Sequence, residues 1–176
     1  MNLRGLAVLV AALALSACAT TAHHGAPDHP EARLYDASTD ATALVDAAIA
    51  RGEKRLVNVL LVLGANWCHD SRAFAGWTQN GRIGELVAER YELVFVNVGM
   101  PQTGDGHNLH IADRYELGEL EGTPTVLIIG PDGTANGHLR NRDTAKSWRN
   151  AASRSEGEIF EELNRYPRPY LGIKPE

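Results

Sequence analysis

Long apolar runs, clusters of basic residues and cysteines are all scarce in this sequence. The most apolar N-terminal run, Leu6 to Leu15, is shorter than the roughly 20 residues that a membrane-spanning helix needs. The 17 basic residues are outnumbered by 22 acidic ones, and they do not gather into a stripe. This balance argues against a nucleic-acid partner and against electrostatic attachment to anionic lipid. No internal repeat is present.

The short apolar run suits an export signal, because Arg4 precedes it and small residues follow it. It ends in Leu15-Ser16-Ala17-Cys18, which resembles the lipobox of bacterial lipoproteins. The resemblance implies a signal peptide over residues 1–17, acylation of Cys18 and durable anchoring by more than one acyl chain. By the same analogy, Ala19 favours the outer membrane, with the protein facing the periplasm of a bacterial envelope. The alternative is an ordinary secretory signal with an incidental Cys18.

Only two cysteines occur, Cys18 and Cys68. With Cys18 committed to lipid, Cys68 is the one free thiol expected in a compartment where thiols normally pair. An unpaired thiol in an exported protein is either reactive or forms an intermolecular bond.

Residues 18–35 carry prolines, threonines and histidines without a hydrophobic period, which predicts a flexible tether. His23, His24 and His29 in this stretch favour a solvated spacer over a loose metal site.

The folded domain is expected over residues 36–176, where helical and buried-strand patterns alternate as in an α/β protein. The predicted helices cover Asp40–Arg51, Ser71–Gln79, Ile83–Arg90, Leu109–Leu117 and one or two segments between Trp148 and Leu163, with a possible break at Gly157. The predicted strands are Leu56–Leu63, Leu93–Val98, Thr125–Ile129 and, after a tight turn at Pro131–Gly133, Thr134–Leu139.

Cys68 lies where a buried strand ends and a helix begins. The first-turn N–H groups and the helix dipole favour a thiolate at such a junction. Trp67 precedes Cys68 and Ser71 follows three residues later, a pattern that resembles the Trp-Cys-x-x-Cys active site of the thioredoxin superfamily with serine as the last residue. A second landmark is Pro124, which must start its strand because proline cannot lie inside a central one. In the superfamily, a cis-proline at this place faces the active cysteine.

The resemblance covers about residues 36–166 and implies a thioredoxin-like three-layer α/β/α sandwich, with a central mixed sheet and helices on both faces. It makes Cys68 the nucleophile flanked by Trp67. Thr123 and Pro124 would line a groove for an extended peptide or thiol substrate, beside His69 and Asp70.

Three departures from the family pattern, at Ser71, at Val62 and at the pair His69-Asp70, shape the expected chemistry. Ser71 cannot resolve a mixed disulfide as a second cysteine would, although its hydroxyl can donate a hydrogen bond to Cys68. Val62 stands where thioredoxins carry a buried carboxylate for proton transfer. We therefore expect monothiol exchange, with release of Cys68 by an external thiol or by a second substrate cysteine. His69 favours the thiolate and Asp70 opposes it.

A rival interpretation is a copper or zinc site, because a thiolate and imidazoles suit these metals. Its ligands would be Cys68, His69, His107 and His110. A peroxidase is disfavoured, because Ala65 stands where peroxiredoxins carry threonine. A non-catalytic docking module with an inert Cys68 is a third possibility.

The preferred interpretation needs no cofactor. Its partners are proteins or small molecules that contain thiols or disulfides, an external thiol reductant, and the membrane through the N-terminal lipid.

Overall fold

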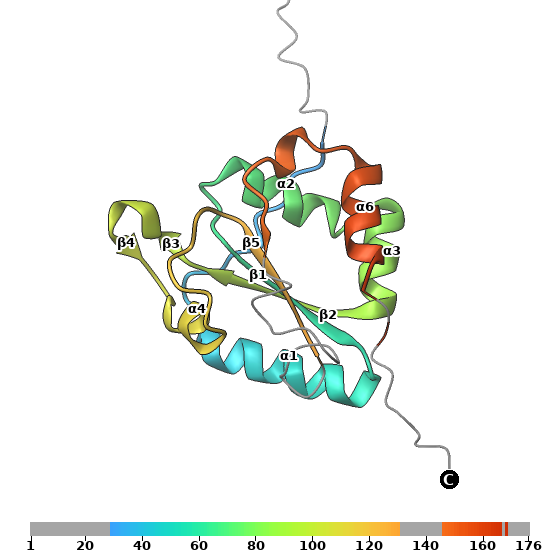
Figure 1. Ribbon diagram of the computed structural model, residues 1–176, viewed down its shortest axis with the longest axis horizontal. Helices are drawn as coiled ribbons and strands as arrows, with labels where there is room; N and C mark the ends of the chain where they lie inside the picture. The colour runs from blue at the N-terminus through green and yellow to red at the C-terminus, as the bar shows by residue number, and fades with distance from the viewer. Residues whose placement is uncertain (1–28, 131–145, 167, 169–176) are drawn as a thin grey trace, which may run out of the picture.

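The computed structural model describes residues 29–130, 146–166 and 168. A four-stranded sheet in the order β2–β1–β5–β6 lies at its centre, and a small hairpin, β3–β4, projects from one end (Figure 1). Helices cover both faces of the sheet, so the predicted three-layer α/β/α sandwich with a mixed sheet is confirmed. The strands are β1 (Asn58–Gly64), β2 (Tyr91–Asn97), β3 (Gly99–Met100), β4 (Asp105–Gly106), β5 (Thr125–Ile129) and β6 (Lys146–Ser147). The helices are α1 (Ala41–Arg55), α2 (His69–Trp77), α3 (Gly81–Arg90), α4 (His110–Arg114) and α6 (Glu156–Asn164), with short 3₁₀ turns at Pro101–Thr103 and Ala151–Ser153.

Strand β1 is the centre of the sheet, and all of its residues are buried. It pairs in parallel with β2 and antiparallel with β5. A strand covered on both faces needs apolar side chains in both directions, which explains the continuous run that begins at Val59. Val62, the apolar residue at the position where a carboxylate would assist proton transfer, is fully buried.

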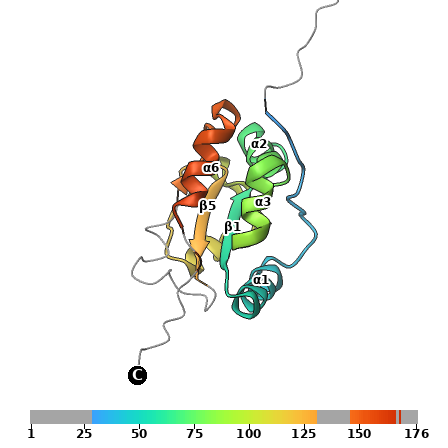
Figure 2. The same ribbon diagram turned by 90° about the vertical axis from the view of Figure 1, so that its right-hand side faces the viewer.

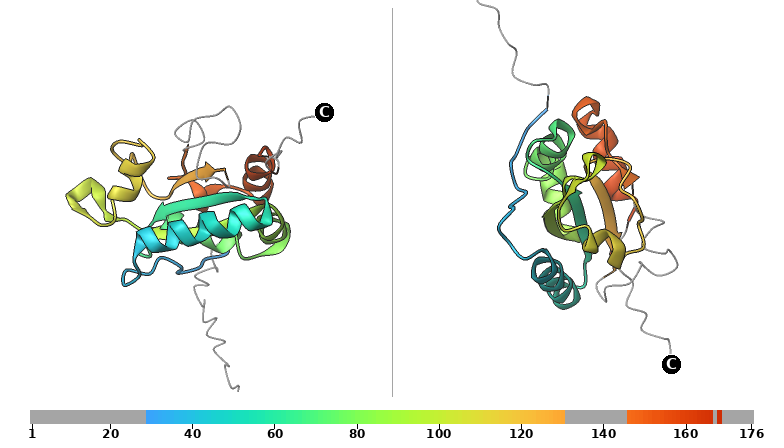
Figure 3. Two further views of the ribbon diagram at one scale, coloured as in Figure 1. Left: turned by 90° about the horizontal axis from the view of Figure 1, so that it is seen from below. Right: turned by 90° about the vertical axis from the view of Figure 1, so that its left-hand side faces the viewer.

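Alternate residues of β1 pack into two separate hydrophobic cores, one on each face of the sheet. Leu60 and Val62 pack with α2, α3 and α6 on one face. Leu61 and Leu63 pack with α1 and α4 on the other. Figure 1 shows α1 below the sheet and α2, α3 and α6 above it, and the view from below in Figure 3 (left) shows α1 lying across the sheet. Strand β1 is thereby fixed at its carboxyl end, where Cys68 follows.

Several element ends differ from the prediction. Asp40 caps α1, and the helix continues past the predicted end at Arg51, through Gly52 to Arg55, before it ends on Leu56, whose φ is +57°. Gly52 lies inside the helix, where a Cβ would be only 3.0 Å from the carbonyl oxygen of Val57. Glycine at this position therefore allows close packing and does not mark the end of the helix.

Further along the chain, the predicted loop after Val98 contains the β3–β4 hairpin. The predicted break at Gly157 is also wrong, since Gly157 lies inside α6. In that helix Ser155 and Glu158 form a reciprocal capping box, which starts the helix before the glycine.

The segment 29–35, here called the arm, packs along the domain from α2 towards α1 (Figure 2). Tyr35 is 1% exposed, and the N–H of Ala32 donates to the carbonyl of Arg72 at 3.0 Å. The packed domain thus begins before residue 36, earlier than the sequence suggested.

Residues 1–17, residues 18–28 of the predicted tether with Cys18, the predicted turn at 131–133 and the predicted strand at 134–139 lie outside the described residues. In the part that is described, no helix has the length and apolar character needed to cross a membrane.

Gly76 lets the arm approach α2, and Gly76→Ala should loosen it. A Cβ at this position would lie 2.6 Å from the backbone nitrogen of Glu31 and closer still to the carbonyl group of Pro30. Because backbone cannot rotate away as a side chain can, we expect a loss of about 1–3 kcal/mol in the free energy of unfolding and faster tryptic cleavage after Arg33. Gly157→Ala is the matched control: its nearest neighbour would be 3.6 Å away, so helix propensity should stabilise that variant by about 0.4–1 kcal/mol. Equal effects of the two substitutions would contradict the proposed packing.

Glu92 ties β2 to the end of α1 and should make stability depend on pH. Its carboxylate accepts from Arg51 Nε at 2.7 Å and from Arg55 Nη1 at 2.6 Å. Burial acts to raise the pKa of Glu92, but the hydrogen bonds and charges of Arg55 and Arg51 outweigh it and hold the pKa below its ordinary value. A carboxyl with a lowered pKa in the folded state stabilises fully above its unfolded pKa, about 4.3. This stabilisation is lost as the pH falls through the folded-state pKa.

We therefore expect Glu92→Gln to reduce the free energy of unfolding by about 1–3 kcal/mol at pH 7. The difference from the parent should shrink near pH 3, where Glu92 is itself neutral. Urea unfolding at the two pH values measures this. Asp46→Asn, which breaks the exposed pair between Asp46 and Arg114, should cost at most about 1 kcal/mol. A cost of Glu92→Gln that stays the same at both pH values would contradict the assignment.

Candidate active site

Cys68 is the N-cap residue of α2, directly after the turn that leaves β1. Its backbone is extended (φ −77°, ψ 124°), and its carbonyl accepts from the N–H of Arg72 at 3.1 Å, which closes the first helical turn. The helix begins at His69, two residues before the predicted start. The side chain is a half-buried free thiol. The sequence-predicted junction of strand and helix is therefore present, with the sulfur at the positive end of the helix.

The second predicted landmark faces the first. The Thr123–Pro124 peptide bond is cis, and Cys68 Sγ donates to the carbonyl oxygen of Thr123 at 3.3 Å. The two residues are 55 positions apart in the chain. This hydrogen bond exists only while the sulfur carries its proton. Ionisation of Cys68 would free the Thr123 carbonyl to accept from another donor.

Ser71 is completely buried behind the cysteine, and its hydroxyl oxygen accepts from the N–H of Ala65 at 3.4 Å. The expected hydrogen bond from Ser71 to Cys68 is absent among the described residues, in which the thiol donates to the Thr123 carbonyl. The Ser71 carbonyl accepts from the hydroxyl of Tyr35 at 3.1 Å. Burial raises the pKa of Tyr35, so this phenol remains a donor. Ser71 thus fixes the turn beneath the thiol.

Trp67 projects from the other side of Cys68 and is 53% exposed. Its indole nitrogen donates to the carbonyl of Gly99 at 2.9 Å, which ties the active-site turn to the β3–β4 hairpin. A cavity of about 260 Å³ lies there, lined by Trp67, Met100 and His107 among others. A partly apolar cavity therefore adjoins Trp67, the residue before the thiol.

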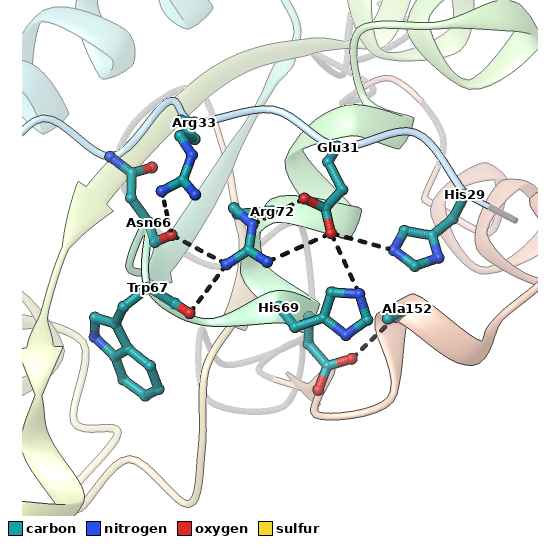
Figure 4. A network of polar contacts seen from close by, with 9 residues as sticks. His29, Glu31, Arg33, Asn66, Trp67, His69, Arg72 and Ala152 are labelled. Atoms are coloured by element: carbon teal, nitrogen blue, oxygen red, sulfur yellow. Dashed lines mark hydrogen bonds and ion pairs between the residues drawn. The ribbon is translucent and has the colours of Figure 1, made fainter. Parts of the chain in front are cut away.

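The two residues between Cys68 and Ser71 point to different neighbours. Asp70 accepts from the N–H of Ala152 at 2.9 Å and so connects α2 to the C-terminal region. His69 extends towards the arm, where its Nε2 lies 3.2 Å from Glu31 Oε1 (Figure 4). Asp70 was predicted to lie with the substrate-binding residues, but in this structure its carboxylate is engaged within the protein.

Arg72 connects the active-site turn to the arm, a role that no sequence pattern indicated. Its guanidinium donates to the carbonyls of Asn66 and Trp67 at 3.2 and 3.0 Å and to Glu31 Oε2 at 2.9 Å (Figure 4). The hydrogen bond from Arg72 is the largest cause of a pKa of Glu31 below its ordinary value. The side chain of Asn66 also exchanges two hydrogen bonds with the backbone of Tyr35. The arm and α2 together hold the loop before Cys68.

The alternative metal ligands are not gathered into one site. His107 lies beside Asp105, with Nε2 3.7 Å from Oδ1, and His110 contacts the hydroxyl of Thr42 at 3.1 Å. Among the described residues, the only group of three or more ligand atoms close enough for one ion is His29, Glu31 and His69. It contains neither Cys68 nor the two loop histidines. The structure thus does not support the copper or zinc site built on the thiol.

The fold and the site together define a thioredoxin-like α/β protein with one cysteine opposite a cis-proline. A family model described as thioredoxin-like matches residues 40–131, just over half of the chain. The chain belongs to this thioredoxin-like family.

A solved structure described as a disulphide isomerase from Xylella fastidiosa Temecula1 is similar to the chain. The two are 29% identical and superpose with a TM-score of 0.65, over 76% of this chain and 96% of the other. The search of curated proteins finds no match.

Proposed function

We propose that the protein carries out monothiol thiol–disulfide exchange through Cys68. The observation that carries the proposal is the meeting of a half-buried, unpaired thiol at the N-terminus of α2 with the cis Thr123–Pro124 peptide. Its membership of the thioredoxin-like family and its likeness to a disulphide isomerase support the same chemistry. The substrates would be exported proteins or mixed disulfides with small thiols.

The exchange has two balanced steps. The Cys68 thiolate attacks one sulfur of a substrate disulfide, forming a mixed disulfide and releasing the other sulfur as a thiolate. An external thiolate, or a second cysteine of the same substrate, then attacks the substrate sulfur and expels Cys68. A disulfide is consumed and another is formed, so the protein needs no bound cofactor and undergoes no net oxidation. Ser71 cannot take part in the second step, since its hydroxyl has no sulfur.

The neighbouring residues would position the substrate. Loss of the thiol proton frees the Thr123 carbonyl, which can then accept from the backbone N–H of an extended peptide, as in strand pairing. Trp67 and the cavity beside it offer apolar contact to the flanking side chains. His69 is more than half exposed next to Cys68 and is available to the substrate. Asp70 contributes by fixing α2.

The place of action would be the bacterial cell envelope. The lipobox-like Leu15-Ser16-Ala17-Cys18 supports a mature protein that begins at an acylated Cys18 and faces the periplasm, with Ala19 favouring the outer membrane. An exporting, oxidising compartment supplies both disulfides and unpaired cysteines. Labelling of intact cells with lipid precursors, compared with a Cys18→Ser chain, tests the anchor separately from the chemistry.

The chemistry is tested with a Cys18→Ser chain, in which Cys68 is the single thiol, incubated with glutathione disulfide. Mass spectrometry should show one glutathionyl adduct, and added free thiol should remove it. The same chain unfolded in urea controls for the intrinsic reactivity of the sulfur. If only the unfolded chain reacts, Cys68 is inert in the fold and the protein is a non-catalytic binding module.

A further inference from the structure

A second cluster of polar side chains lies on the other side of the Cys68 turn, where the arm meets α2. His29 and Glu31 come from the arm, and His69 is the first residue of α2 (Figure 4). The three side chains offer two imidazole nitrogens and one carboxylate oxygen, all within 4.8 Å of one another. Of the three residues, the exchange proposed above uses only His69, as an exposed side chain beside the substrate.

His29 is the most informative member. It is only 9% exposed, and its Nε2 is buried without a hydrogen-bond partner. That nitrogen lies 3.6 Å from Glu31 Oε1, beyond hydrogen-bonding distance. A buried polar atom without a partner costs free energy. The atom is turned into the cluster, towards the same oxygen that faces His69.

The spacing suits a zinc ion. Zinc binds imidazole nitrogen at about 2.0–2.1 Å and carboxylate oxygen at about 2.0–2.2 Å. In a tetrahedron with such bonds, ligand atoms are about 3.3–3.5 Å apart. Glu31 Oε1 lies 3.2 Å from His69 Nε2 and 3.6 Å from His29 Nε2. The cluster therefore needs adjustments of only tenths of an ångström at these two edges.

The residues around the cluster orient the Glu31 carboxylate and leave the cluster accessible to an ion from solvent. Arg72 binds the opposite oxygen of Glu31, Oε2, at 2.9 Å and leaves Oε1 facing the histidines, although Nη2 also reaches Oε1 at 3.5 Å. Its positive charge opposes a cation and should moderate the affinity. The side chain of His69 is 58% exposed and that of Glu31 is 29% exposed, so an ion and a fourth ligand from solvent can enter.

We propose that His29, Glu31 and His69 form a zinc site that clamps the arm onto the active-site helix. Two neutral imidazoles, one carboxylate and a water molecule would complete a tetrahedral shell. The ion links two segments that are about forty residues apart in the chain, so its binding energy stabilises the packed arm. The Cys68 thiol is not among the ligands of this site.

The test is titration of the full chain with zinc chloride in detergent. The background carries Cys18→Ser, His23→Ala, His24→Ala and His138→Ala, which removes possible ligands outside the described residues. We expect one zinc per chain. His29→Ala and Glu31→Gln should each weaken binding at least about tenfold, whereas His107→Ala and Cys68→Ser should leave the affinity unchanged.

Two further readouts keep the test decisive if His29→Ala fails to fold. Zinc at about 100 times its Kd should raise Tm by about 5–10 °C in the background chain and not in Glu31→Gln. The zinc-edge absorption spectrum should show nitrogen and oxygen neighbours without sulfur. No zinc uptake, a sulfur ligand, or undiminished affinity in both His29→Ala and Glu31→Gln would overturn the site. Glutathionylation of Cys68 is measured without zinc, so the two proposals fail separately.

Discussion

Cys68→Ser is expected to abolish disulfide exchange while the fold remains intact. In a Cys18→Ser background this substitution removes the last thiol, so no mixed disulfide can form. We expect no glutathione adduct, and we expect any exchange between substrate disulfides to fall to the rate of the uncatalysed reaction. Quantitative mass spectrometry of the adduct and a substrate exchange assay measure the two effects.

The fold should tolerate this change for a local reason. Cys68 is only half-buried, and its single side-chain hydrogen bond among the described residues goes to the Thr123 carbonyl. A serine hydroxyl can donate to the same acceptor, so the free energy of unfolding should change by less than about 0.5–1 kcal/mol. Residual exchange activity in a correctly folded Cys68→Ser chain would exclude Cys68 as the nucleophile.

The elements nearest the thiol were predictable because strong local patterns encode them. The continuous apolar run into Gly64 specifies a strand buried on both faces, and the polar turn after it leaves Cys68 at a helix start. Pro124 could be placed at the start of β5 because a proline is not accommodated within a central strand. These signals depend on residues that are adjacent in sequence, and the structure places both landmarks within one hydrogen bond of each other.

The arm was not predictable for the opposite reason. His29 and Glu31 stand among prolines with no hydrophobic period, which is also the composition of a tether. Their contacts are polar and connect segments far apart in the chain, as in the ion pair of Glu31 with Arg72. Gly76 carried a weak signal, since a glycine in the middle of a helix often marks a close approach. The partner of Asp70, the N–H of Ala152, lies 82 residues away and has no local signature.

Ser71→Cys should convert the monothiol site into one that closes an internal disulfide. Cys68 is the N-cap and Ser71 the third residue of α2, so both lie in the first helical turn. Side chains three residues apart on a helix have Cβ atoms about 5–6 Å apart, somewhat longer than the mean in a disulfide, about 3.8 Å. A small rotation at the extended N-cap, which is not held by helical φ and ψ, brings the two sulfurs together.

Under oxidising conditions in the Cys18→Ser background, we expect thiol titration to find no free thiol in this variant and one in the parent. The glutathione adduct should no longer accumulate, because the introduced thiol expels the substrate sulfur from Cys68. The larger sulfur must fit a fully buried site beside Gly64, whose hypothetical Cβ would lie 2.7 Å from Ser71 Oγ, so the reduced variant should lose about 1–3 kcal/mol of stability. Ser71→Ala is the control that keeps a single thiol and a stable adduct. Two free thiols in a folded, oxidised Ser71→Cys chain would show that the turn does not bring these positions together, and monothiol chemistry would then follow from the geometry of the turn and not from the serine.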